Sequence, residues 1–122
     1  MYEEVSKWID NLPLQSIPEE VTAFCFNLYD GCDNLHWSME LIGASRFDVD
    51  DEDWACDEIT DFESRTQEFK WTKEASWDVV FAEMLSTLKE YLEKGQYADA
   101  LKSKHGVGAG FTEGNIEILY SK

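Results

Sequence analysis

A segment that is apolar on both of its faces constrains the fold of this chain most. Side chains alternate between the two sides of a β-strand, and Val21–Tyr29 places apolar residues on both sides. A strand of this kind is buried on both faces, so we expect it at the centre of a sheet. One face would hold Phe24, Phe26 and Leu28, and the other Val21, Ala23 and Cys25.

The residues that follow predict an antiparallel partner strand and a covering helix. Asp30–Asn34 is a strong turn signal, and Trp37–Phe47 alternates apolar with polar residues, so the two strands would form a hairpin. Ser76–Lys94 carries a continuous apolar stripe at helical spacing, with Ser76 as its N-cap. Further predictions are helices at Tyr2–Leu12 and Gln96–Lys104, strands at Trp54–Phe62 and Phe69–Thr72, and a terminal hairpin of Val107–Phe111 with Asn115–Tyr120.

This order of elements predicts an α+β fold, because antiparallel strands with helices grouped apart from them are typical of that class. We expect one antiparallel sheet of about four to six strands. The N-terminal helix, the long amphipathic helix and the short helix would pack on it. A length of 122 residues without a linker or an internal repeat indicates a single domain spanning residues 1–122.

Negative charge is concentrated in the first part of the sequence. Residues 8–69 contain sixteen Asp and Glu but only Arg46 and Arg65 as basic residues, which gives −14 of the chain's net charge of −16. Like charges repel one another in a compact state, so we expect the concentration to serve a function. Nucleic acids and anionic lipids bind through Lys and Arg, so neither is an expected partner. Basic proteins and cations are favoured instead.

The acidic stretch between Phe47 and Ser64 is the candidate partner-binding surface. It contains nine acidic residues and no basic one, and it begins in a predicted turn. A merely solvated surface and a weak, irregular cation site are the alternatives. The calcium loop of an EF-hand is excluded, because Asp53 and Ile59 stand where that loop needs Gly and Glu. The predicted surface comprises Asp48, Asp50, Asp51, Glu52, Asp53, Trp54, Asp57, Glu58 and Asp61.

The five tryptophans divide into two groups. Trp8, Trp37 and Trp77 lie on apolar faces and are predicted to belong to the core. Trp54 and Trp71 lie among charged residues. Trp is enriched at interface hot spots and attracts cationic side chains, so Trp54 is the predicted aromatic anchor of the acidic surface. An ordinary half-buried strand residue is the alternative interpretation of both.

No motif in the sequence predicts catalysis or a bound cofactor. The glycine-rich Gly106–Gly110 follows a predicted helix and precedes a strand, which is the reverse of a dinucleotide-binding loop. His36 and His105 are the only histidines, and no Ser or Cys lies in a nucleophile motif. No paired spacing of Cys and His favours zinc. We therefore expect no catalytic residue, no metal and no cofactor.

The cysteines and the amino terminus indicate a cytoplasmic protein. Cys25, Cys32 and Cys56 are odd in number, whereas secreted disulfide frameworks usually use an even number, so reduced thiols are expected. The first residues lack the basic and apolar regions of a signal peptide. No stretch approaches the roughly 20 apolar residues of a membrane span, so no membrane contact is expected. The sequence leaves the oligomeric state open.

The end of the chain, Val107-Gly-Ala-Gly-Phe-Thr-Glu-Gly-Asn-Ile-Glu-Ile-Leu-Tyr120, looks like hairpins of small bacterial domains. Together with the small size, the acidity and the lack of catalytic motifs, it makes the chain resemble the immunity proteins of bacterial polymorphic-toxin systems, including those of contact-dependent growth inhibition. The resemblance is one of type. It implies a cytoplasmic inhibitor that binds one cognate toxin, often a basic nuclease, and it assigns no functional residue.

The expected function is therefore that of an immunity protein, which is not an enzyme and neutralises a basic toxin through the acidic surface. A nuclease is the leading case, since the carboxylates would cover its phosphate-binding surface. Complementary charge chiefly speeds the encounter, and a few desolvated anchors supply affinity. The alternatives are an acidic interaction module or adaptor subunit unrelated to toxins, and a carboxylate-metal enzyme.

Overall fold

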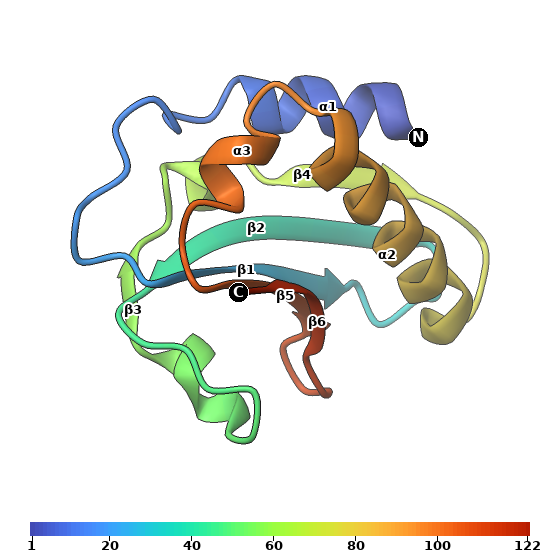
Figure 1. The fold of residues 1–122 in the computed structure, drawn as a ribbon. Coiled ribbons are helices and arrows are strands. Elements are labelled where there is room, and N and C mark those ends of the chain that lie inside the picture. Colours follow the sequence, from blue (N-terminus) through green and yellow to red (C-terminus); the bar gives the residue numbers. More distant parts are fainter.

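The computed structural model of the chain describes residues 1–122 and places six strands in one sheet (Figure 1). The strand order is β3-β2-β1-β5-β6. Both β3 and β4 pair with the edge of β2 that faces away from β1: β4 pairs with the first half of β2, and β3 with its last residues. The predicted α+β class is confirmed. The strands are β1 (Ala23–Asp30), β2 (His36–Ala44), β3 (Glu58–Thr60), β4 (Phe69–Thr72), β5 (Gly106–Phe111) and β6 (Glu117–Ser121).

The centre of the sheet lies where the sequence places it. β1 pairs with β2 as an antiparallel hairpin and with β5 on its other edge, so it is flanked on both sides. The sheet differs from the expectation in one pair, because β1 and β5 run parallel. Parallel neighbours need a long crossover, and here the chain returns to β5 through the helices. The predicted terminal hairpin is present as β5 and β6.

Three helices cover one face of the sheet: α1 (Tyr2–Asp10), α2 (Trp77–Lys94) and α3 (Ala98–Leu101). Figure 1 shows all three on the same side. None of them combines the length and the hydrophobicity that crossing a bilayer requires. The core between the helices and the sheet consists of eighteen buried side chains, among them Val5, Ile9, Phe24, Phe26, Leu28, Met39, Leu41, Met84, Leu88, Tyr91 and Val107.

The other face of the sheet has a smaller core, which Trp54 covers. The indole is fully buried against Ala23, Cys25, Ile42 and Ala44. Small residues on this face make room for it. At Gly108, for example, an added Cβ would lie 3.1 Å from Cζ2 of Trp54 and 2.8 Å from Cγ2 of Ile116.

The strand predicted at Trp54–Phe62 is wrong for most of its length. The chain forms a 3₁₀ helix, η1 (Glu52–Cys56), and only Glu58–Thr60 is extended. At the start of η1, the Asp51 side chain accepts a hydrogen bond from the N–H of Asp53, which favours a helical turn. At the other end, Phe62 and Glu63 adopt positive φ angles of 51° and 61°, so the strand cannot continue through them.

The short helix near the C-terminus also differs from its prediction. The segment Gln96–Lys104 is helical only over Ala98–Leu101, and Gly106 begins β5 instead of closing a helix. Gly95 ends α2 as expected, but its backbone is extended, with φ −73° and ψ 160°. Its lack of a side chain matters for packing, because an added Cβ would lie 2.4 Å from the Tyr91 ring.

Candidate protein-binding surface

The acidic stretch forms a lobe on the face of the sheet away from the helices. We call residues 46–58 the acidic lobe; it contains η1 and lies below the sheet in Figure 1, in green. Asp48, Asp50, Asp51, Glu52, Asp53 and Asp57 lie in it and are exposed. Glu58, at the start of β3, is also exposed. Asp61 lies directly after β3, outside the acidic lobe, and is partly buried, so all the predicted carboxylates except this one lie in the acidic lobe and are exposed.

Short-range hydrogen bonds shape the backbone of the acidic lobe. The Asp48 carboxylate accepts from the N–H of Asp50 at 2.9 Å, and the Asp51 carboxylate accepts from the N–H of Asp53 at 3.0 Å. Asp favours such local turns because its short side chain reaches the backbone two residues on. The repeated Asp of this stretch thus has a structural role beside its charge.

Few of the predicted carboxylates are neutralised by the protein's own basic residues. Arg46 pairs with Asp57 and, at 3.5 Å, with Asp51, while Arg65 binds Glu58 at 2.7 Å. The other five form no ion pair: Asp48, Asp50, Glu52, Asp53 and Asp61. The side chains of Asp50 and Asp53 also accept no hydrogen bond within the chain, so their charges face solvent directly.

The prediction that Trp54 is an exposed anchor is wrong. Its side chain is fully buried, and Phe47 packs edge-on against it with ring centroids 5.0 Å apart. Trp54 therefore attaches the acidic lobe to the sheet and offers no surface to a partner. The prediction that Trp77 belongs to the core is also wrong, since 56% of that residue is exposed.

A buried carboxylate beside the acidic lobe was not predicted from the sequence. Glu40, in the middle of β2, is 1% exposed and lies on the same sheet face as the acidic lobe. Arg65 donates to it at 2.8 Å, the Tyr29 hydroxyl at 2.6 Å and the Asn27 amide at 3.1 Å. One signal could have revealed this network. Glu40 lies between Met39 and Leu41 in a predicted strand, a buried carboxylate needs a cation, and Arg65 is one of only two basic residues among residues 8–69.

The pKa values of this network follow from its geometry. Burial by itself would raise the pKa of Glu40, but hydrogen bonds from Arg65, Tyr29 and Asn27 outweigh it and hold that pKa below its ordinary value. Burial and the adjacent Glu40 raise the pKa of the Tyr29 hydroxyl. Arg65 also binds Glu58 and so joins the buried carboxylate to the exposed acidic surface. The network thus connects β1, β2 and β3 on this face of the sheet through hydrogen bonds and ion pairs.

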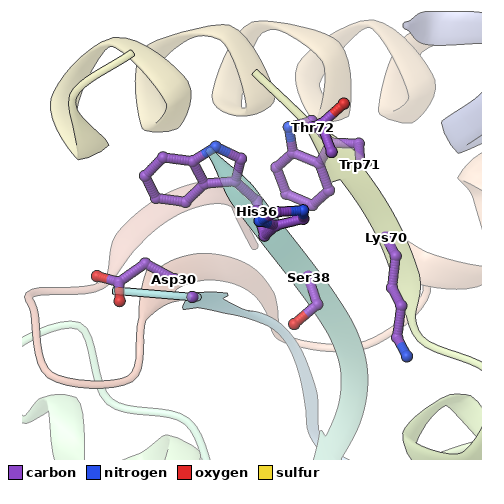
Figure 2. A pocket seen from close by; sticks show the side chains of 8 residues that line it. Asp30, His36, Ser38, Lys70, Trp71 and Thr72 are labelled. Carbon is purple, nitrogen blue, oxygen red and sulfur yellow. The ribbon is translucent and has the colours of Figure 1, made fainter. Parts of the chain in front are cut away.

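A cavity of about 480 Å³ lies farther along the same face, where β1 and β4 end and β2 begins (Figure 2). Figure 2 shows Ser38 and Lys70 pointing to the same side of β2 and β4, whereas the ring of Trp71 points toward the helices. Acidic and basic groups are mixed here. The lining residues are Asp30, Gly31, His36, Trp37, Ser38, Lys70, Trp71 and Thr72.

The groups near this cavity do not form a catalytic arrangement. His36 Nδ1 lies 2.5 Å from Oδ2 of Asp33, and hydrogen bonds from His36 and Leu35 lower the pKa of Asp33 to about 2. No hydrogen bond joins His36 to the hydroxyl of Ser38, two residues on in β2, or to that of Thr72, its pairing partner in β4. Nowhere in the chain do three His, Cys, Asp or Glu side chains converge as a metal site requires. The polar and charged side chains of the cavity can form hydrogen bonds and ion pairs with a ligand, but no nucleophile is hydrogen-bonded to a base there.

Comparison with known proteins identifies no relative that could assign a role to this surface. The chain matches no family model, no curated protein and no solved structure.

Proposed function

We propose that this protein is an immunity protein that binds and neutralises a basic toxin, with a nuclease as the leading case, through the acidic lobe. The observation that carries the proposal is the exposure and clustering of these carboxylates, most of which have no ion pair with the protein's own basic residues. Asp50 and Asp53 have neither an ion pair nor a hydrogen bond to their side chains. Carboxylates held ready for an external cation accelerate association with a basic protein and select against acidic ones.

The rigid attachment of the acidic lobe supports the same proposal. Fully buried Trp54 and the hydrogen bond from Ile116 N–H to Glu52 hold η1 against the sheet. A surface whose backbone is fixed before binding loses less conformational entropy when a partner docks. Binding, not catalysis, is therefore the activity we assign to this face.

The test uses the whole chain and the protein encoded by the neighbouring reading frame as the probe. We expect the chain to protect cells that produce this neighbour and to bind it in solution. The association rate should fall about tenfold between roughly 0.05 M and 0.5 M salt, because exposed charges are screened over this range. An association rate indifferent to salt contradicts the proposal.

Two charge-matched variants show where the partner binds. Asp50→Asn with Asp53→Asn removes two unpaired charges of the acidic lobe, and Glu93→Gln with Asp99→Asn removes two exposed charges of the helix layer. We expect the first pair to weaken binding about tenfold and the second to leave it within about twofold. A neighbour that does not bind, together with co-purification of a housekeeping complex, would replace the proposal with an adaptor function.

A further inference from the structure

An apolar groove of about 330 Å³ lies between α2 and the terminal β5–β6 hairpin. Trp77, Phe81 and Leu85 face it from α2, since residues four apart share one side of a helix. Phe111 faces it from the hairpin, with its ring centroid 6.0 Å from that of Trp77 and 5.7 Å from that of Phe81. The walls of the groove are therefore aromatic.

Trp77 is unusually exposed for a side chain in such a cluster. It is the first residue of α2, and 56% of it remains accessible although it packs edge-on against Phe111. A large ring held by a neighbour but open to solvent loses little entropy on binding and buries much area. Such rings are typical of the energetic centre of protein interfaces. This is the role that the sequence assigned to Trp54.

The rim of the groove is acidic. Asp78 and Glu117 line it, and no Lys, Arg or His does. Neither carboxylate forms an ion pair within the chain; Asp78 accepts a hydrogen bond from the Ser76 hydroxyl. An apolar floor with an unneutralised acidic rim complements an apolar side chain next to a cation. A second copy of this chain is a poor occupant, because it would bring the same charges and a net charge of −16.

The groove adjoins the acidic lobe across the turn of the terminal hairpin. Phe111 and Gly114 line both the groove and a second cavity of about 350 Å³. The far wall of that second cavity includes Glu52 and Asp53 of the acidic lobe, and it too has no basic residue. One partner could therefore reach the acidic lobe and the groove on the two sides of the hairpin.

We infer that the groove is the anchoring site for a segment of a cationic protein. An apolar side chain of that segment packs against Phe81 and Phe111 beside Trp77. A neighbouring Lys or Arg of the segment lies over the Trp77 ring and faces Asp78 and Glu117. The inference rests on the proposed function, to which it adds the apolar part of the interface.

The test is selection of a displayed library of random decapeptides on the immobilised full chain. We expect enriched peptides to combine Lys or Arg with an adjacent aromatic or aliphatic residue. Trp77→Ala should weaken them about thirtyfold, the change typical of a hot-spot residue. Asp78→Asn with Glu117→Gln should weaken them about threefold to tenfold. Glu19→Gln with Glu20→Gln, which removes two exposed charges that lie neither in the acidic lobe nor at the groove, is the control and should change affinity less than about threefold.

Three outcomes overturn the inference. Enriched peptides could lack the paired charge and apolar residue, or they could bind Trp77→Ala as tightly as the parent chain. Sedimentation could also reveal a dimer that Trp77→Ala abolishes, which would make the groove a contact between copies. The circular dichroism of Trp77→Ala is recorded to establish that the variant folds. The two proposals fail separately: a neighbour whose binding depends on Asp50 and Asp53 but not on Trp77 leaves the proposed function standing and removes the groove.

Discussion

Glu52 in the acidic lobe and Ile116 before β6 are joined by a hydrogen bond from the Ile116 N–H to the Glu52 carboxylate. The two residues are 64 positions apart in the chain. The contact holds the acidic lobe against the terminal hairpin, and on the other side of that hairpin lies the groove of Trp77. One carboxylate thus connects the acidic lobe to the hairpin that forms a wall of the groove.

Glu52→Ala should release this contact without unfolding the protein. The hydrogen bond from the Ile116 N–H is exposed, so water can take the place of the carboxylate. We therefore expect a loss of about 0.5–1.5 kcal/mol in the free energy of unfolding. Hydrogen exchange at the Ile116 amide should accelerate, because local opening no longer breaks a bond. Glu52→Gln retains an acceptor oxygen and should keep most of the protection. Equal exchange rates in Glu52→Ala and the parent chain would contradict this prediction.

Trp54→Ala and Trp77→Ala should differ sharply in stability. Removing the fully buried Trp54 leaves a cavity, and such substitutions lower the free energy of unfolding by about 3–5 kcal/mol. Removing the largely exposed Trp77 should lower it by about 1 kcal/mol or less. Urea denaturation followed by circular dichroism measures both. A larger loss of unfolding free energy in Trp77→Ala than in Trp54→Ala would contradict the burial of Trp54 and the exposure of Trp77.

These two tryptophans mark the limit of what the sequence can predict. The periodicity of Val21–Tyr29 identifies the central strand, and the stripe of Ser76–Lys94 identifies the main helix, because both signals are local. The burial of Trp54 is not a local property. It depends on a surface that small residues of other strands provide, such as Ala23, Ala44 and Gly108. The charged neighbours of Trp54 therefore suggested an exposed side chain.

The candidate site was predictable to a similar extent. The acidic stretch and its exposure follow from composition, since unpaired carboxylates stay in water. The pairing of Glu40 with Arg65 joins residues 25 positions apart, and only the turn of β3 toward η2 (Ser64–Thr66) brings them together. Trp77 was assigned to the core because its spacing continues the apolar stripe of the helix. Spacing does not reveal that the first turn of a helix has fewer neighbours.

Cys25 should resist alkylation in the native protein, whereas Cys32 and Cys56 react. Cys25 is buried in the cluster beneath Trp54, and burial, with the charge of Glu40 nearby, raises the pKa of its thiol to about 12. Mass spectrometry after iodoacetamide treatment at about pH 8 should therefore find two modified thiols. Trp54→Ala should expose Cys25 and accelerate its modification, with the rate at Cys32 as an internal control. Rapid modification of Cys25 in the parent chain would show that the acidic lobe opens readily.

Glu40→Gln should reduce the loss of stability in acid. The pKa of Glu40 is lowered in the folded protein, so its contribution to stability is complete above the unfolded value of about 4.3 and disappears as the pH falls through the folded value. Gln cannot ionise, and its amide presents donors to Arg65, so at pH 7 we expect a loss of about 1–3 kcal/mol. The difference between the variant and the parent chain should shrink as the pH falls from about 6 to 3. Glu74→Gln removes one exposed charge without a hydrogen-bonded partner and is the matched control in urea denaturation at each pH. A constant difference across this range would show that Glu40 titrates alike in the folded and unfolded chains, and that Arg65 and Tyr29 do not stabilise its charge.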